Sequence, residues 1–355
     1  MRYLAFTLIS LLTTISIQSA DYDEVIEGFD VPWGMVQLAD GDFLVTERSG
    51  TLYRVSEGKE RVAVTNLPAV SARGQGGLLD IILHPEYSTN GWIYISYASA
   101  EGEGSGDNTN IIRAKINGTE LTDVETIYKA SPNYPRRFHY GSRMSFDKDG
   151  MLYFSIGDRG ERDVYPQDTA QDGGKIYRVH ADGKIPADNP FADSAKPAVY
   201  SYGHRNPQGM AMHPESGQIW THEHGPRGGD EINIVEAGKN YGWPVISYGI
   251  NYNGTTFTDI TEKEGMEQPV HQWTPSIAPS GMVFVTSDKY PDWKGHLLVG
   301  SLKFNNLELI KLDGSEITSV DKVLEGIGRV RNVVQLADGY IYVATDSEGI
   351  YRVTP

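Results

Sequence analysis

Two stretches near opposite ends of the chain share one pattern: VQLADGDFLVTERSGTLYRV at residues 36–55 and VQLADGYIYVATDSEGIYRV at residues 334–353. Each has a turn that ends in glycine, a short strand rich in aromatic and β-branched residues, and then a second turn and strand. Such strands between Gly- and Asp-containing turns are typical of β-hairpins. Because the hexapeptide VQLADG occurs in both copies, the two stretches indicate a repeated unit.

Four further stretches follow the same pattern: STNGWIYISYASA from Ser88, DKDGMLYFSIGDRG from Asp147, PESGQIWTHEHGP from Pro214 and DWKGHLLVGSLKFNNLELIKL from Asp292. Six irregularly spaced units predict an all-β fold, a six-bladed β-propeller of four-stranded antiparallel blades, because a solenoid tolerates less variation in spacing. The matching first and last units predict that both chain ends help to close the ring. A plain β-sandwich, the alternative, would not explain six similar units.

Composition bounds the remaining possibilities. The chain has 355 residues, a formal net charge of −16 and no cysteine. Disulfides, thiolate metal sites and cysteine nucleophiles are therefore excluded, and the acidic balance argues against nucleic-acid binding. Residues 1–20, MRYLAFTLISLLTTISIQSA, predict a signal peptide, with an uncleaved anchor as the alternative. We expect residues 21–355 to form a single propeller domain, periplasmic or secreted, with no transmembrane segment in the mature chain.

Two segments between the predicted strands carry candidate catalytic or binding groups. In ARGQGGLLD, Gln75 lies among glycines that allow close backbone approach to a ligand, although a simple turn is the alternative. In RRFHYGSRMSF, His139 lies beside Tyr140 and Gly141 near a strand entrance. Histidine is the usual general base near neutral pH, but a lone histidine is more often a structural or surface group.

Two further segments are difficult to explain by folding alone. In GHRNPQGMA, Arg205 and Asn206 precede Pro207, and arginine suits a carboxylate or a developing oxyanion. In HEHGPRGGDEIN, residues 222–233, the backbone around Gly225 and Pro226 can direct carbonyl oxygens to one point. That chemistry favours calcium over zinc, for which two histidines alone are a weak signal, and a solvated turn is the other reading.

The last candidates are cations in VGSLKFNN and GIGRVRNVV. Lys303 lies in the first segment, and Arg329 and Arg331 lie in the second. Strand alternation places the two arginines on one face, where they repel each other unless an anion lies between them or water solvates them.

Together these residues make the chain resemble the PQQ-dependent soluble aldose sugar dehydrogenases, the glucose/sorbosone dehydrogenase family. GHRNPQGMA and HEHGPRGGDEIN are the most specific matches, and the resemblance covers nearly the whole mature chain. It implies that His139 is the catalytic base, that Arg205 stabilises charge during catalysis, and that pyrroloquinoline quinone (PQQ) and Ca²⁺ are the cofactors. The implied PQQ contacts are Gln75, Arg205, Asn206, Lys303, Arg329 and Arg331. The implied calcium ligands are the main-chain oxygens of Gly225 and Pro226, with a second ion held partly by the carbonyls of Glu231 and Tyr241.

The resemblance also implies a reaction: oxidation of an aldose at its anomeric carbon to a lactone, with hydride transfer to PQQ and electrons passing to an external quinone, dye or redox protein. Because PQQ is a tri-acid, a bound carboxylate would relieve the repulsion between Arg329 and Arg331. The alternatives are a calcium-dependent lactonase, which needs no such cation cluster, and a non-enzymatic sugar-binding propeller with Tyr248 and Trp273 as stacking surfaces.

Two positions depart from the family pattern. Phe138 precedes the histidine where some members have an acid, so the histidine's orienting partner is not identified by the sequence. Asn251 is expected where relatives supply an acidic ligand to the second calcium.

Overall fold

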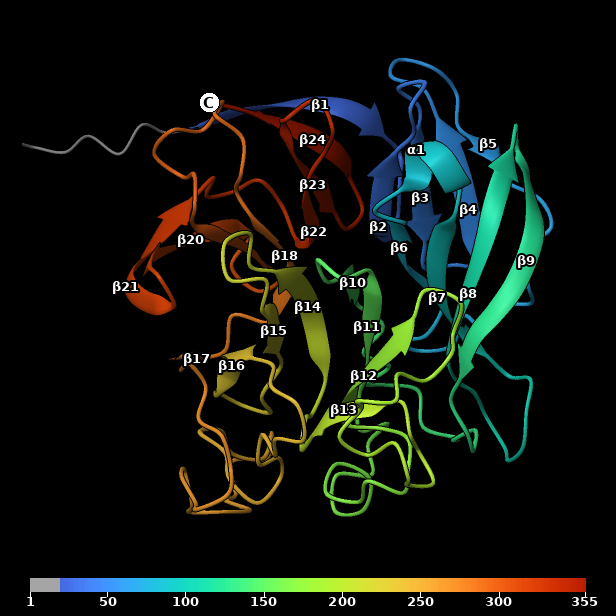
Figure 1. Cartoon of the computed structure of the whole chain (residues 1–355). Coiled ribbons are helices and arrows are strands. Elements are labelled where there is room, and N and C mark those ends of the chain that lie inside the picture. Colours follow the sequence, from blue (N-terminus) through green and yellow to red (C-terminus); the bar gives the residue numbers. More distant parts are fainter. Residues whose placement is uncertain (1–19) are drawn as a thin grey trace, which may run out of the picture.

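The computed structural model describes residues 20–355, which form six four-stranded antiparallel sheets around a central axis (Figure 1). The predicted six-bladed all-β propeller is confirmed. The predicted signal peptide lies outside the described residues, apart from its last position, Ala20. Within residues 20–355, no helix has the length and apolar character needed to cross a membrane.

Five blades are each built from four consecutive strands, and in every blade the first strand lies next to the axis. The strands are β2 (Pro32–Gln37), β3 (Phe43–Glu47), β4 (Thr51–Val55) and β5 (Val62–Ala63); β6 (Leu78–Leu83), β7 (Ile93–Ser99), β8 (Asn108–Asn117) and β9 (Glu120–Lys129); β10 (Met144–Phe146), β11 (Met151–Ile156), β12 (Lys175–His180) and β13 (Val199–Tyr202); β14 (Pro207–Met212), β15 (Ile219–Glu223), β16 (Asp230–Ile234) and β17 (His271–Trp273); and β18 (Pro279–Phe284), β19 (Leu297–Ser301), β20 (Asn306–Asp313) and β21 (Glu316–Val323). One short helix, α1 (Tyr87–Asn90), precedes β7 in the described chain.

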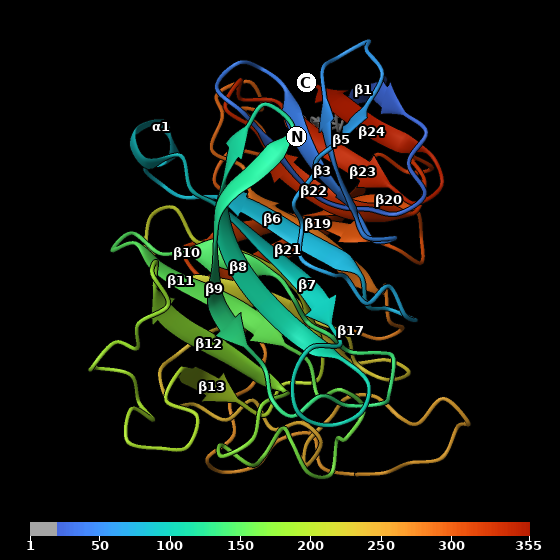
Figure 2. The same ribbon diagram turned by 90° about the vertical axis from the view of Figure 1, so that its right-hand side faces the viewer.

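The sixth blade closes the ring with strands from both ends of the chain. It contains β22 (Val330–Gln335), β23 (Ile341–Thr345), β24 (Gly349–Thr354) and, as its outer strand, β1 (Asp21–Glu27). β1 pairs antiparallel with β24 from Asp21↔Thr354 to Glu27↔Gly349, and Figures 1 and 2 show the two strands side by side. The predicted closure by both chain ends is therefore confirmed.

The hydrophobic core lies between neighbouring blades. Every residue of β3, β7, β15, β19 and β23 is buried, because these second strands are covered on both faces. Aromatic rings fill the space between the second and third blades, where Tyr94 packs against Phe146 and Phe154 stacks on Tyr177. Exposure increases towards the outer strands, and both residues of β5 are exposed.

The repeated turn found in the sequence joins the first and second strands of every blade. Its glycine has a positive φ in all six copies, which only glycine adopts without strain; these are Gly41, Gly91, Gly150, Gly217, Gly295 and Gly339. We call this side of the propeller the hairpin end. Because the paired strands are antiparallel, each first strand begins, and each second strand ends, at the opposite side, which we call the loop end.

Candidate active site

All the predicted site residues that border a first or second strand lie at the loop end. Gln75 precedes β6, His139 precedes β10, and Arg205 and Asn206 precede β14. Gly225 and Pro226 follow β15, Lys303 follows β19, Arg329 precedes β22 and Arg331 lies near its start. The fold therefore brings residues from five blades to one mouth of the channel. Glu231 lies in β16 and Tyr241 in the loop after it.

His139 is held in one orientation by contacts from two other segments. Its Nδ1 lies 2.6 Å from Oδ1 of Asp158, and its backbone N–H donates to Oε1 of Gln75 at 2.9 Å. His139 has a φ of +59°, a conformation that a non-glycine residue keeps only when its surroundings impose it. A Cβ on Gly157 would lie 2.4 Å from the carbonyl oxygen of His139, so the glycine permits this close approach.

Asp158 is the orienting partner that the sequence did not identify. It is buried, and its carboxylate also accepts hydrogen bonds from Nε1 of Trp243 at 2.9 Å and from the N–H of Gly160 at 2.7 Å. Burial opposes its ionisation, but the charge of and hydrogen bond from His139, with the charge of Arg205, outweigh it and lower the pKa of Asp158. As an acceptor-only carboxylate it takes the Nδ1–H of His139, which leaves Nε2 as the basic nitrogen.

The pKa of His139 lies below its ordinary value. Burial is the largest cause, and the positive charge of Arg205 acts in the same direction. Asp158 raises the pKa, but by less than these two effects lower it. The imidazole is therefore neutral at neutral pH and able to accept a proton.

Arg205 is fixed beside the histidine. Its Nη1 donates to the carbonyl of His224 at 3.0 Å, its backbone N–H donates to Glu223, and its guanidinium lies 5.3 Å from the ring centre of Trp243. Its Nε is buried and has no hydrogen-bond partner among the described residues. Asn206 is also buried, and its Oδ1 accepts the N–H of Gly141 at 3.1 Å.

A cavity of about 610 Å³ opens in front of these groups. Its lining includes four of the predicted site residues: Gln75, His139, Arg205 and Pro226. Asp158 and Trp243 also line it, with a rim that includes Arg162, Asn251 and Tyr252. Lys303, Arg329 and Arg331 are not part of this lining.

These three cations lie across the channel mouth, on the fifth and sixth blades. Arg329 donates to the carbonyl of Leu302 at 2.7 Å, beside Lys303, and both Arg329 and Arg331 form ion pairs with Asp346. Asp346 thus supplies a negative charge for both arginines, whereas the sequence suggested only a bound carboxylate as their counter-charge. The Arg329 side chain is still 50 % exposed, and Lys303 is exposed, so both can reach an anion.

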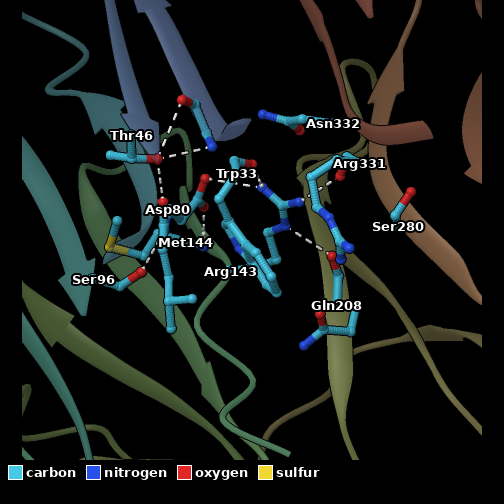
Figure 3. A network of polar contacts seen from close by, with 12 residues as sticks. Trp33, Thr46, Asp80, Ser96, Arg143, Met144, Gln208, Ser280, Arg331 and Asn332 are labelled. Carbon is cyan, nitrogen blue, oxygen red and sulfur yellow. Dashed lines mark hydrogen bonds and ion pairs between the residues drawn. The ribbon is translucent and has the colours of Figure 1, made fainter. Parts of the chain in front are cut away.

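The floor of the channel mouth is a buried arginine network (Figure 3). Arg143 forms an ion pair with Asp80 and donates from Nη1 to the carbonyl of Trp33 at 3.2 Å. It also donates from Nε to Gln208 at 2.8 Å and from Nη2 to Arg331 at 3.0 Å, in both cases to the backbone carbonyl. One side chain therefore ties the first strands of four other blades together beneath the site, and it fixes the backbone of Arg331.

The histidines of HEHGPRGGDEIN serve a structural purpose. Nε2 of His222 contacts the carbonyl of Ser280, and Nε2 of His224 lies 2.6 Å from that of Pro279, so each donates an N–H to the next blade. Burial and the nearby His224 lower the pKa of His222 to about 3. Among residues 20–355, no group of three or more His, Asp or Glu side chains is placed to hold a metal.

The acids of the same stretch surround a second, much smaller cavity. Glu223, Glu231 and Tyr241 line it together with Gly225, and burial and the charge of Glu223 raise the pKa of Glu231 to about 8. Two acids this close need a cation or a proton between them. Asn251 does not line this cavity; its Oδ1 accepts from Arg162 at 2.9 Å on the rim of the larger one.

Acids at the loop ends of second strands were the main residues that sequence reasoning missed. Glu47 and Glu223 end β3 and β15, Asp346 directly follows β23, and Asp158 lies two residues beyond β11. The signal was present in the repeats themselves, as the acids in FLVTE, YFSIGD, IWTHE and YVATD. These acids can be recognised as site residues only when it is known that the strand ends meet at one mouth of the channel.

A comparison with known proteins places this geometry in a family. Residues 29–352 match the family model described as glucose/sorbosone dehydrogenase. The aldose sugar dehydrogenase YliI of Escherichia coli is 39% identical over 336 residues, which cover 92% of this chain and 90% of that protein. The chain belongs to the glucose/sorbosone dehydrogenase family. It is thus an oxidoreductase of the sugar dehydrogenase class, as the sequence resemblance predicted.

Solved structures of this family agree with the fold in detail. The apo-form of the E. coli soluble aldose sugar dehydrogenase matches with a TM-score of 0.89 and 36% identity, covering 95% of this chain and 100% of that chain. The PQQ-bound aldose sugar dehydrogenase of Streptomyces coelicolor matches with a TM-score of 0.78 and 29% identity, covering 95% and 98%.

Proposed function

We propose that this glucose/sorbosone dehydrogenase oxidises aldose sugars at the anomeric carbon to lactones, using PQQ and Ca²⁺, with His139 as the general base. The observation that carries the proposal is the Asp158–His139 pair, which faces the same cavity as Arg205. A neutral histidine oriented by a buried carboxylate, beside a fixed cation, is the arrangement that proton removal with charge stabilisation requires.

The residues at the mouth fit a planar tri-acid cofactor. Exposed Lys303 and half-exposed Arg329 provide cationic donors, and buried Nε of Arg205 has no partner within residues 20–355. Arginine and lysine are the side chains that bind carboxylates most strongly. We assign the PQQ contacts to Gln75, Arg205, Asn206, Lys303, Arg329 and Arg331, and the PQQ-bound S. coelicolor relative supports this cofactor.

The same mouth fits calcium, a hard cation that prefers oxygen ligands. Pro226 lines the larger cavity and Gly225 the smaller one, which places their loop between the two. Asp230 holds this loop, because its carboxylate accepts the N–H groups of Gly225 at 2.9 Å and Ala278 at 2.8 Å. We assign one ion to the carbonyls of Gly225 and Pro226, and a second to the carbonyls of Glu231 and Tyr241, beside the carboxylates of Glu223 and Glu231 that line the same small cavity.

The chain's own residues then act on the sugar as follows. Nε2 of His139 takes the proton from the anomeric hydroxyl, and Asp158 stabilises the imidazolium through Nδ1–H. Gln75 holds the backbone of His139. The positive charge of Arg205 would stabilise the negative charge that develops on the hydride acceptor. When bound, the quinone would supply the hydride acceptor, with calcium as its Lewis acid. An external quinone, dye or redox protein would accept the two electrons taken from the sugar, and we propose that it meets the enzyme in the periplasm or outside the cell.

Reconstitution of the purified chain tests this proposal. Addition of PQQ and Ca²⁺ should produce glucose-dependent dye reduction, and omission of either should abolish it. Lactone hydrolysis with Ca²⁺ alone would instead indicate a lactonase. Glucose binding with neither activity would indicate a non-enzymatic sugar-binding propeller.

A further inference from the structure

Tyr252 is a large aromatic residue whose side chain is exposed to solvent in the folded protein. It is 72 % exposed, more than any other large hydrophobic residue in the described chain. It lies in the long connection between β16 and β17, and it lines the same cavity as His139 and Arg205. An exposed aromatic face at the rim of a catalytic cavity is a common way to bind a ligand.

The turn that carries Tyr252 is held in place by hydrogen bonds on both sides of it. The backbone N–H of Asn251 donates to the carbonyl of Thr255 at 3.0 Å, and the N–H of Gly254 donates to the carbonyl of Asn251 at 2.9 Å. The Asn251 side chain bonds to Thr255 at 3.0 Å and accepts from Arg162 at 2.9 Å. Tyr252 therefore lies in a turn that is closed by hydrogen bonds.

The same connection is packed against the catalytic pair. Phe257 contacts Trp243 edge-on at 5.3 Å, and Arg162 lies 4.7 Å above the ring of Phe257. Trp243 in turn donates to Asp158, the partner of His139. A short chain of contacts thus fixes the position of the Tyr252 turn relative to the catalytic base.

Charged side chains line the same cavity as Tyr252. They are Arg136 and Glu161, paired at 3.0 Å, together with Arg162 and Asp163, paired at 3.4 Å. A sugar ring offers an apolar face of C–H groups and an edge of hydroxyls. An exposed aromatic ring in a cavity that is also lined by carboxylate and guanidinium groups matches both features.

We propose that Tyr252 forms an outer subsite for the second sugar ring of a disaccharide or longer oligosaccharide whose reducing end is oxidised at His139. This inference rests on the proposed function, because it places the anomeric carbon at the catalytic base. Glucose fills only the inner position. Maltose reaches across the rim and stacks its non-reducing ring on Tyr252.

The test compares maltose with glucose on the PQQ- and Ca²⁺-loaded enzyme. Tyr252→Ala should lower kcat/KM for maltose about fivefold, the scale of one aromatic stacking contact, and change it less than about twofold for glucose. Tyr252→Phe should keep the wild-type ratio because it keeps the ring. Tyr22→Ala, at an exposed tyrosine on β1, removes a ring remote from the cavity and should change neither sugar.

Calorimetric titration of the unloaded chain with maltose and with glucose gives a second readout that needs no activity. Weaker maltose binding by Tyr252→Ala, with unchanged glucose binding, supports the subsite even if the loaded wild type oxidises neither sugar, a result that would overturn only the proposed reaction. Equal changes for both sugars, no change for maltose, or a loss in Tyr252→Phe as large as in Tyr252→Ala would overturn the subsite.

Discussion

The two ends of the propeller are built in opposite ways. At the hairpin end, all six connections between first and second strands contain a glycine at positive φ, and each has the same task of reversing the chain. At the loop end, no two blades contribute the same segment: one provides Gln75, the next provides His139 and Asp158, and a third provides Arg205. The repeated connections at the hairpin end hold the blades together, and the loop end carries side chains that occur only once.

This contrast teaches where a substitution should affect stability and where it should affect chemistry. A change at the hairpin end alters one of six similar turns, so it should cost free energy of folding and leave turnover intact. A change at the loop end disturbs a group with no duplicate. Matched pairs of variants, one from each end, test the contrast directly.

The largest difference is expected for histidine. His139→Gln should lower turnover by on the order of 10²–10⁴-fold, because the general base is lost. His213 lies in a hairpin turn, where its Nδ1 accepts from Glu215 and Ser216. His213→Gln should cost about 1 kcal/mol of stability and leave kcat unchanged. Near-normal turnover in His139→Gln would remove the role assigned to this residue.

Glycine provides the next pair. Gly157→Ala places a methyl group 2.4 Å from the carbonyl oxygen of His139, and the displaced base should lower kcat by about 10²-fold. Gly150, at the hairpin end, has a φ of +76° and open space around it. Gly150→Ala should cost only about 1 kcal/mol in thermal unfolding, with full activity. Equal activities in these two variants would contradict the contrast between the ends.

A smaller effect, with a diagnostic pH dependence, is expected for Asp158→Asn. Wild-type kcat/KM should stay high until the pH falls below the ordinary histidine pKa of about 6.5, because burial and Arg205 lower the pKa of His139. Asp158 opposes that shift, so removal of its charge should move the acid limb to still lower pH. Activity should fall about tenfold, since the amide oxygen can still accept the Nδ1–H. An acid limb that moves to higher pH would contradict this arrangement.

The last comparison concerns calcium, and its readout is stability with no effect on chemistry required. At a hundredfold excess over its Kd, the ion should stabilise the wild type by about 2.7 kcal/mol, seen as a higher Tm that EGTA reverses. Glu231→Gln should lose part of this gain, whereas Glu215→Gln, in a hairpin turn, should keep it. A calcium response that is the same in both variants would argue against an ion at Glu231.

The sequence was sufficient to predict the blades and their closure because both depend on local turn chemistry that each repeat carries, as in LADG and DKDG. The sequence also named Arg205, in a segment that folding alone does not explain, and His139, through the family resemblance; the roles of both residues stay predictions. Asp158 was missed because its role depends on a contact across 19 positions, between a loop and a strand end.

Asp346 and Tyr252 were missed for related reasons. Asp346 reads as an ordinary turn acid after YIYVAT, and only the folded sheet shows it between Arg329 and Arg331. Tyr252 lies in a connection whose length gave no information about its shape. Positions set by long-range packing are therefore the part that a single sequence leaves open.

The central claim is that groups from separate blades meet at the loop end around one flat, anionic cofactor. A crystal structure of the chain soaked with PQQ and Ca²⁺ tests this most directly. We predict cofactor density at the mouth beside His139, with Arg205, Lys303 and Arg329 touching its carboxylates or quinone oxygens. Density at any other place, or Lys303 and Arg329 turned into bulk solvent with the mouth empty, would contradict the account.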